Sequence, residues 1–372
     1  MKQDEQLSTL ALTRIPGLGH ITVYNLIKAV GSAVEIFNNR KKLPELIPGA
    51  TTKLVQALNC PEAFHRAEKE LLYAEKNQIQ CITITDENYP VRLRECNDAP
   101  VALFYRGNVP LNALHIVSIV GTRHSTAYGM DLCNNFIADL SQLLPDTLIV
   151  SGLAYGIDII AHRAALQNNL NTVGVLAHGL DRIYPSVHRN TAIKMMEQGG
   201  LLTEFMSETN PDRQNFVKRN RIVAGMADAT IVVESAAKGG ALITAELAES
   251  YHRDCFAFPG RTSDEFSTGC NELIRNNRAS LITSAKDFIQ AMNWDTNLEK
   301  RQKNIQRELF LNLSNEEEAI VQILQQSPEG LQINTLVIRT NIPINRMSAL
   351  LFELEMKGIV KALAGSIYRM ID

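Results

Sequence analysis

Residues 116–152 read IVSIVGTRHSTAYGMDLCNNFIADLSQLLPDTLIVSG, in which two short β-rich runs, 116–120 and 148–150, flank a helical stretch at 128–144. The same alternation continues to about residue 292. Further β-rich runs lie at 172–176, 201–203, 231–233 and 256–258, and helical stretches lie at 157–168, 191–197, 220–227, 242–250 and 270–276. Six strands joined by helical crossovers predict a parallel sheet covered on both faces. Right-handed crossovers make it a doubly wound, Rossmann-like α/β core.

A helical segment, residues 1–78, precedes this core. It contains Ile-Pro-Gly-Leu-Gly at 15–19 and a second Ile-Pro-Gly at 47–49, each followed by apolar residues at helical spacing. Such turns leave backbone amides open at a helix N-terminus, as in the helix-hairpin-helix elements of DNA-binding proteins. Turns inside a small helical bundle need the same glycines, and we favour this interpretation. Residues 79–114, which include strand-like runs, are predicted to be a connector that opens a core domain of residues 79–293.

The C-terminal part, residues 314–372, has the order of a winged helix. Ser314 and Glu317 predict a capping box at the start of its first helix. Two more helical stretches follow, and Ala-Gly at 364–365 predicts a hairpin turn. The polar residues 294–313 carry no apolar stripe and are predicted to link the core to this domain.

The composition is that of a globular chain of 372 residues, 45% hydrophobic and 21% charged. Lys and Arg number 37 against 40 Asp and Glu, so the net charge of −3 excludes a uniformly basic nucleic-acid binder but allows a local basic site. The six cysteines are too far apart for a zinc-binding pair, so we expect no metal and interpret them as reduced thiols of a cytoplasmic protein. The start MKQDEQLSTL is unlike a signal peptide, and no apolar run could span a bilayer, so no membrane association is expected.

Chemically distinctive residues follow the predicted strands, at the edge where open α/β sheets bind ligands. After the first strand come Gly121, which permits close backbone approach, Arg123 at the tip of the turn, and Ser125, which suits a helix N-cap. Gly239 and Gly240 precede a later helix and offer a backbone cradle for an anion. The patterns GxGxxG and GxxxxGK[ST] are absent from the sequence, so no nucleotide cofactor is expected.

The basic run 213–221 is the most specific of these features. It contains Arg213, Phe216, Lys218, Arg219, Asn220 and Arg221. Cations neutralise phosphates and an aromatic ring stacks on an unpaired base, so this mixture suits single-stranded nucleic acid better than duplex. We expect DNA contacts from Arg213 and Lys218. Arg219 and Arg221 are either further contacts or buried partners of the two strand-end glutamates described next.

Two pairs of titratable residues admit a catalytic interpretation. Glu204 and Glu234 follow different strands and could form an acid–base pair, or they could tie down loop amides. Asp158 and His162 are four residues apart and share a predicted helix face. Because no obvious nucleophile accompanies them, we favour a structural brace over a catalytic pair.

In combination these stretches resemble the DNA-processing protein A family, also called DprA or Smf. The matching motifs span about 150 residues in the family's order: VGTRHSTAYG at 120–129, SGLAYGIDIIAHRAAL at 151–166, GLDRIYP at 179–185, FVKRNRIVAGMADATIVVESAAKGGALITAELA at 216–248, FPG at 258–260 and GCNELI at 269–274. The helix-hairpin-helix-like start and the winged-helix-like end also fit the family.

The resemblance implies a Rossmann-like core that binds single-stranded DNA in a basic pocket and forms a homodimer. It implies a role without catalysis: the family protects incoming single strands during natural transformation and loads the RecA recombinase onto them. The pocket would be lined by the side chains of Arg123, Arg213, Phe216 and Lys218, with the amides of Gly121, Gly239 and Gly240 on phosphates. The same motifs supply the remaining expected contacts, Ser125, Arg219, Asn220 and Arg221.

The sequence departs from the family pattern at two places. Both departures change which residues supply positive charge around the expected pocket. Val217 and Lys218 stand where relatives often have a proline and a small residue. Ser186 stands where some relatives have a lysine, with His188 and Arg189 shortly after it.

Two other functions stay open from the sequence. The first is a nucleotide-processing Rossmann enzyme, such as the phosphoribohydrolases that resemble lysine decarboxylases. These enzymes carry a PGGxGTxxE loop. This chain has only separated parts of that motif, at 234, 238–241 and 259–260. The second is a transcription regulator that binds duplex DNA through its winged helix. The basic side chains of residues 314–372 are few and spread out, which favours a protein contact over duplex DNA.

Overall fold

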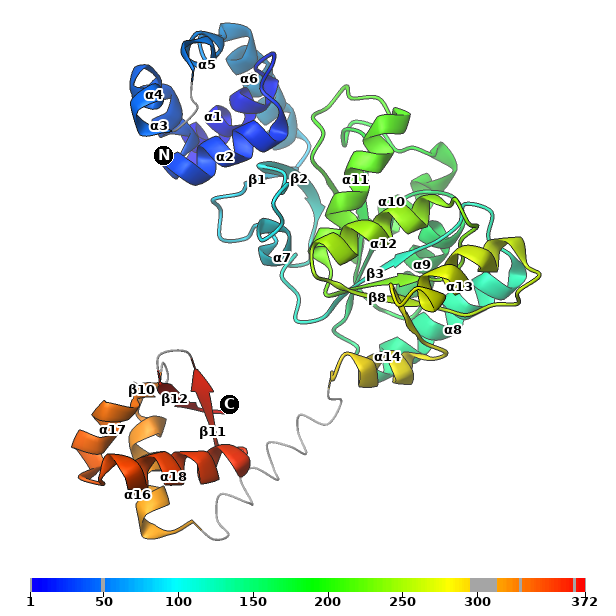
Figure 1. The fold of residues 1–372 in the computed structure, drawn as a ribbon. Helices are drawn as coiled ribbons and strands as arrows, with labels where there is room; N and C mark the ends of the chain where they lie inside the picture. The colour runs from blue at the N-terminus through cyan, green and yellow to red at the C-terminus, as the bar shows by residue number, and fades with distance from the viewer. Residues whose placement is uncertain (1, 48–50, 295–312, 328–329, 364–365, 372) are drawn as a thin grey trace. The chain divides into compact units, whose positions relative to one another are not determined.

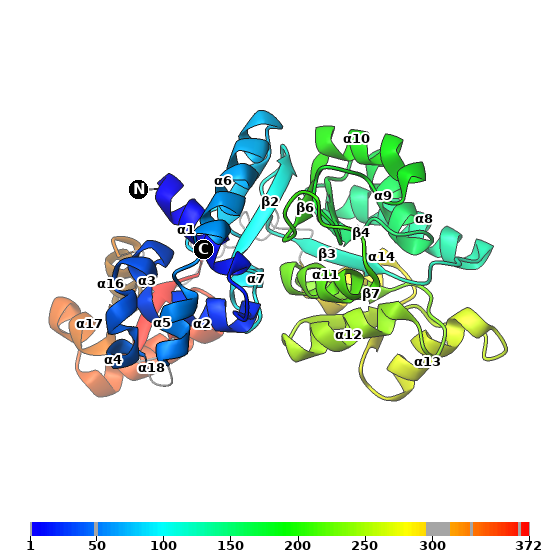
Figure 2. The same cartoon turned by 90° about the horizontal axis from the view of Figure 1, so that it is seen from above.

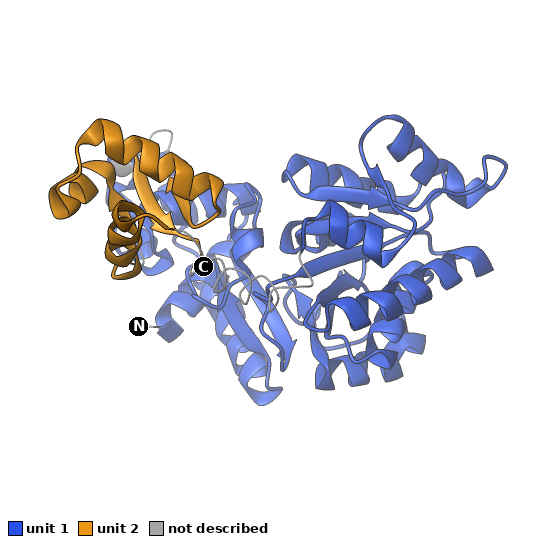
Figure 3. Ribbon diagram, turned by 90° about the horizontal axis from the view of Figure 1, so that it is seen from below, with its two compact units in different colours: residues 1–294 blue, residues 295–372 orange. Residues whose placement is uncertain are grey.

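The computed structural model describes residues 2–47, 51–294, 313–327, 330–363 and 366–371. Backbone contacts divide the chain into two compact units, Met1–Trp294 and Asp295–Asp372, which Figure 3 distinguishes by colour. The linker predicted at 294–313 lies almost wholly outside the described residues.

The first unit opens with a group of helices (Figure 1), whose apolar side chains form a buried cluster that also includes residues of the sheet. They are α1 (Lys2–Arg14), α2 (His20–Val30), α3 (Ala33–Asn38), α4 (Leu43–Leu46), α5 (Thr52–Ala57) and α6 (Pro61–Lys76), with a 3-10 turn, η1 (Arg40–Lys42). Gly17, at φ +83°, makes the predicted turn between α1 and α2. The second Pro-Gly motif lies mostly outside the described residues. Leu12 and Ile36 are buried in one cluster with Phe104 of the sheet, which explains why the helices and the sheet belong to one unit.

The described residues of this unit form a nine-stranded sheet in the order β1-β2-β6-β5-β4-β3-β7-β8-β9. The strands are β1 (Gln80–Thr83), β2 (Ala102–Gly107), β3 (Ile116–Val120), β4 (Leu148–Gly152), β5 (Thr172–Val175), β6 (Gly199–Thr203), β7 (Ala229–Val232), β8 (Asp254–Ala257) and β9 (Ser280–Leu281). All neighbours from β6 to β9 pair in parallel, as predicted. β2 pairs antiparallel with β1 and with β6, so the predicted connector is in fact an antiparallel edge of the same sheet.

Helices cover both faces of the parallel strands (Figure 2). One face carries α8 (Ala127–Leu143), α9 (Ile157–Gln167), α10 (Arg189–Glu197) and α14 (Ala285–Ala291), and the other carries α11 (Arg213–Met226), α12 (Gly240–Ser250) and α13 (Thr268–Arg275). The short elements α7 (Val91–Arg94), η2 (Ser186–His188) and η3 (Glu265–Ser267) lie in the connections. In β3, Val117 and Ile119 are buried under α8 and α9, whereas Ile116 and Val120 are buried under α11 and α12. The strand is apolar throughout because both of its faces are covered, and the Rossmann-like prediction is confirmed.

α11 begins at Arg213, seven residues before the helix predicted from the sequence at 220–227. The first turns of α11 contain few apolar residues, so the sequence shows no helical repeat of apolar positions there. The basic run 213–221 is therefore helical, and its side chains point in different directions around the axis instead of along one loop.

The described part of the second unit has the winged-helix order. It holds α16 (Asn315–Gln325), β10 (Leu331–Gln332), α17 (Ile333–Thr340), α18 (Ile344–Met356), β11 (Val360–Leu363) and β12 (Ile367–Met370). The predicted capping box is present: Ser314 Oγ accepts from Glu317 N at 3.3 Å, and Glu317 Oε2 accepts from Ser314 N at 2.8 Å. Leu336, Met347 and Leu354 are fully buried in the core. The predicted turn at 364–365 lies outside the described residues.

No helix among the described residues is long and apolar enough to cross a membrane. Nor do three or more His, Cys, Asp or Glu side chains of these residues gather as metal ligands would.

Candidate nucleic-acid interface

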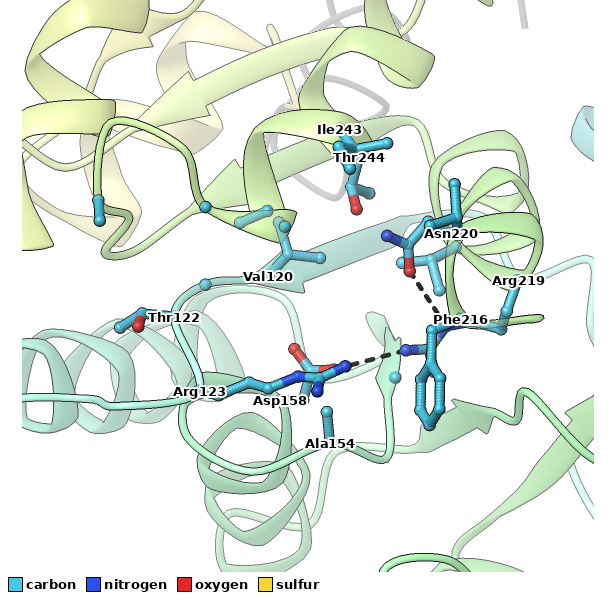
Figure 4. A pocket seen from close by; sticks show the side chains of 18 of the residues that line it. Val120, Thr122, Arg123, Ala154, Asp158, Phe216, Arg219, Asn220, Ile243 and Thr244 are labelled. Atoms are coloured by element: carbon cyan, nitrogen blue, oxygen red, sulfur yellow. Dashed lines mark hydrogen bonds and ion pairs between the residues drawn. The ribbon is translucent and has the colours of Figure 1, made fainter. Parts of the chain in front are cut away.

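A cavity of about 620 Å³ opens at the carboxyl ends of β3, β4 and β7 (Figure 4). The strand order reverses at β3, because β4, β5 and β6 follow one another on one side of it and β7 and β8 lie on the other. Open α/β sheets bind ligands at such a switch point, and the volume is within the range of small-molecule and nucleotide sites. The loops after these strands and the first turns of α11 and α12 form the walls.

One face of α11 lines the cavity. Arg213, Phe216, Val217 and Asn220 all border it, at the i, i+3, i+4 and i+7 spacing that places residues on one side of a helix. Phe216 is only partly buried, so its ring is accessible from the cavity. The fold thus brings together three of the expected contact residues, a cation, a ring and an amide.

The loop between β3 and α8 forms the facing wall. Gly121 sits where an added Cβ would overlap the side chain of Ile157, so this turn requires glycine. Arg123 is exposed, and in Figure 4 its side chain extends from this loop toward Asp158 and Phe216. Its Cζ lies 5.1 Å from the centroid of the Phe216 ring, which is a cation–π distance. Two expected contacts from different elements therefore meet in the cavity.

Arg219 forms part of the cavity floor. Its side chain is 4% exposed and donates to the Val175 carbonyl and, at 3.2 Å, to Asn220 Oδ1. Its Nη2 lies 4.0 Å from Asp158 Oδ2. Burial lowers the pKa of Arg219 and raises the pKa of Asp158, and the attraction between the two charges opposes both shifts. Because Nε and Nη1 of Arg219 already donate to protein groups, its main contribution to the cavity floor is its positive charge.

The N-terminus of α12 also faces the cavity. The Gly239 N–H donates to Ala236 O at 3.0 Å, so this amide is not available in the way the sequence predicted. Gly240 is the first residue of α12, and an added Cβ there would meet no atom within 4 Å. An anion can approach this backbone closely and is favoured by the helix dipole. Lys238 and Thr244 line the same wall but were not among the contact residues expected from the sequence. The i+4 spacing of Thr244 from Gly240, which places both on one helix face, was a signal for Thr244.

Two other expected contact residues, Ser125 and Lys218, are not among the residues that border the cavity. The N-cap of α8 is Thr126 and not Ser125, since Thr126 Oγ1 accepts from Gly129 N at 3.2 Å. Lys218 is exposed but lies off the cavity-facing side of α11.

Arg221 also lies outside the cavity wall and is buried. Its guanidinium donates to the carboxylate of Glu204 and to the carbonyl of Asp98. Of the two roles that the sequence left open for Arg221, the buried partner of Glu204 is the one present in the structure. A DNA contact would require this buried ion pair to break, so we no longer include Arg221 among the contacts.

The two strand-end glutamates have separate partners. Glu204 pairs with Arg221, whereas Glu234 accepts from Thr126 N at 3.0 Å and from Thr126 Oγ1 at 2.5 Å. Neither glutamate borders the cavity. Glu234 fixes the start of α8, and the acid–base interpretation of the pair loses its structural support.

His162 acts as a brace, but Asp158 is not its partner. The ring is fully buried, with Nδ1 2.7 Å from Thr172 Oγ1 and Nε2 2.7 Å from the carbonyl of Gly152. Burial lowers the pKa of His162 to about 4, so the ring is neutral at pH 7. It ties the end of β4 to the start of β5, and Gly152, whose carbonyl it contacts, borders the cavity.

In the winged-helix unit, the basic side chains on α18 and just past its end are paired with carboxylates. Little unpaired positive charge is left there to contact duplex DNA. Arg346 is held by Glu316 at 2.8 Å, and Lys357, just past the helix, is held by Glu317 at 2.5 Å. Phe352, at 63% exposure, gives the outer face an apolar character.

More positively than negatively charged side chains border the cavity. Arg123, Arg213, Arg219 and Lys238 border it against one carboxylate, Asp158, among the described residues. Cations and a helix N-terminus hold phosphates, and an accessible ring stacks on a base. The arrangement can therefore bind a short length of unpaired polynucleotide.

Comparisons with known proteins agree with this chemistry. A family model described as DNA recombination-mediator protein A matches residues 80–293, and one described as DprA winged helix domain matches residues 311–366. The DNA processing protein DprA of Streptococcus pneumoniae is 38% identical over 228 residues, which cover 61% of this chain and 79% of that protein. Protein Smf of Escherichia coli is 32% identical over 310 residues, covering 82% of this chain and 80% of that protein.

Two solved structures are similar to the chain as well. The X-ray structure of DprA from Streptococcus pneumoniae gives a TM-score of 0.58 at 33% identity and covers 74% of this chain and 98% of that one. A structure of DNA processing protein A from Helicobacter pylori, described with its single-stranded DNA binding mode, gives a TM-score of 0.52 at 29% identity and covers 58% of this chain and 95% of that one.

Proposed function

Because the chain belongs to the DNA-processing protein A (DprA/Smf) family, we propose that its Rossmann-like core binds and protects single-stranded DNA without sequence specificity. One observation carries the proposal: the accessible ring of Phe216 shares a cavity with Arg123 and Arg213. The single-stranded DNA binding described for the Helicobacter pylori relative supports it.

The mechanism is binding without bond-breaking. Arg123, Arg213 and Lys238 neutralise phosphates, the open backbone at Gly240 receives one phosphate oxygen, and one base stacks on Phe216. Stacking is tolerant of sequence because every base has a π-face. A paired base cannot leave its stack to reach the ring without a cost in free energy, so the cavity favours unpaired DNA over duplex.

The wider role that we propose is delivery of the protected strand to RecA during recombination and natural transformation, in the cytoplasm. The description of the family as recombination mediators supports this step. We further propose a homodimer formed through the Rossmann-like core. Two cavities on one strand would raise the overall affinity through effective concentration.

The binding proposal is tested by fluorescence anisotropy with labelled oligo-dT and with a mixed-sequence duplex. We expect the single strand to bind more tightly, with the logarithm of affinity falling by about 0.7 per neutralised phosphate for each unit in the logarithm of salt concentration. Three contacts predict a loss of roughly tenfold or more between about 50 and 200 mM salt. Equal affinity for the duplex, or affinity that salt does not change, would contradict the proposal.

The roles in assembly need separate measurements. Light scattering of the full chain should give the mass of a dimer. RecA should assemble faster on single strands coated with a single-strand-binding protein when the chain is present, and nucleoside monophosphates incubated with it should release no free base. A monomeric mass would contradict the dimer, an unchanged assembly rate would contradict RecA loading, and base release would indicate an enzyme.

A further inference from the structure

A second exposed ring lies beside Phe216. Tyr184, in the connection between β5 and α10, is 47% exposed, and its ring centroid lies 6.2 Å from that of Phe216 with the planes tilted by 61°. Phe216 borders the cavity, whereas Tyr184 is not among its lining residues. Together the two rings form an aromatic surface that begins inside the cavity at Phe216 and continues outside it at Tyr184.

The segment that carries Tyr184 is held in place by polar contacts. Asp181 Oδ1 accepts from Glu208 N at 3.1 Å. Arg182 donates to Asp181 Oδ2 and, at 2.9 Å, to Asn210 Oδ1. These contacts tie the loop to the segment that follows β6, and they pair the guanidinium of Arg182 with a carboxylate. What the loop presents to solvent at this point is the ring of Tyr184.

Among the described residues, none forms a hydrogen bond with the Tyr184 hydroxyl. Tyr128, which is equally exposed at 47%, donates its hydroxyl to Pro259 O at 2.8 Å. An exposed aromatic ring held by its backbone and by ring contact, with a free hydroxyl, has the features of a stacking platform.

We propose that Tyr184 stacks the base of the nucleotide next to the one held by Phe216, and so guides the strand out of the cavity. The inference rests on the proposed single-stranded DNA binding and identifies a binding residue beyond the cavity. The 61° tilt means that bases on the two rings cannot be parallel. The strand therefore turns between them, which an unpaired strand can do and a stacked duplex cannot without losing its stacking.

The test uses oligo-dT of increasing length with wild-type chain, Tyr184→Ala and Phe216→Ala. For oligonucleotides long enough to leave the cavity, Tyr184→Ala should lower affinity by roughly tenfold, the loss expected for one stacked base. The shortest oligonucleotide that binds should show no difference, whereas Phe216→Ala should weaken binding at every length. Tyr184→Phe, which keeps the ring, and Val187→Ala, which removes an exposed apolar side chain of the same segment, should both bind as the wild type does.

A double-mutant cycle assigns the effect to one nucleotide. An abasic site moved along the oligonucleotide should, at one position, weaken wild-type binding about as much as Tyr184→Ala does, and should cost little more in that variant. Equal affinity of Tyr184→Ala and wild type for long oligonucleotides, or additive losses at every abasic position, would overturn the inference. If the wild type binds no single strand, the proposed function itself fails, which is a different result.

Discussion

The guanidinium of Arg123 lies over the ring of Phe216, with its Cζ 5.1 Å from the ring centroid. The contact joins the β3–α8 loop to the first turns of α11, two elements separated by about 90 residues of sequence. Each side chain alone is common on protein surfaces. Together they place a cation for phosphate and a face for a base within the same small volume.

Phe216→Ala should weaken binding of single-stranded DNA by about 1–3 kcal/mol, which is roughly five- to 150-fold in affinity. The loss comes from the stacked base and not from charge, so the salt slope should stay that of the wild type. Anisotropy titrations at several salt concentrations measure both quantities. Phe216→Trp keeps a ring and should retain binding; a Trp variant as weak as the Ala variant would argue against stacking.

Arg221→Met should destabilise the first unit without a direct effect on DNA. The change leaves the largely buried Glu204, whose side chain is 14% exposed, without its partner, and breaking a buried ion pair in this way costs about 3–5 kcal/mol. Urea unfolding at pH 7 measures the loss. Arg278→Met, which removes the partner of the exposed Glu249, is the matched control and should cost less than about 1 kcal/mol.

The same variant separates stability from binding. Folded Arg221→Met protein should bind oligo-dT within about twofold of wild type, because Arg221 does not border the cavity. A large loss of affinity in a variant that is still folded would restore Arg221 as a DNA contact.

His162 should make stability depend on pH in the acidic range. Its pKa falls from 6.5 in the unfolded chain to about 4 in the folded one, so between these values the unfolded state binds the extra proton. The stabilisation is complete above pH 6.5 and is lost as the pH falls toward 4, by about 3 kcal/mol in total. Urea unfolding of wild type and His162→Gln at several pH values tests this. The variant should lack this part of the pH dependence, and parallel curves for the two proteins would contradict the assignment.

The fold was largely predictable because its strands carry a strong signal. Strands buried on both faces, such as β3, are apolar throughout and stand out from the helices between them. β9 and β10 have two residues each, too few to show any pattern. The pairing of β1 with β2 at the antiparallel edge depends on contacts that local sequence does not encode.

The cavity was predictable in outline but not residue by residue. The glycine turns and the basic run are visible in the sequence, and the end of a parallel sheet is where such groups meet. The direction of each side chain depended on where α11 begins. With the helix starting at Arg213, the 3.6-residue period turns Phe216 and Asn220 toward the cavity and leaves Lys218 outside.

Comparing Arg213→Glu with Lys218→Glu in oligo-dT binding tests the central claim most directly. Both side chains are exposed cations on α11, and both changes alter the net charge equally, but only Arg213 borders the cavity. We predict that Arg213→Glu lowers affinity by about tenfold or more, whereas Lys218→Glu stays within about threefold of wild type. Equal losses in the two variants, or a greater loss for Lys218→Glu, would show that the strand does not bind in this cavity.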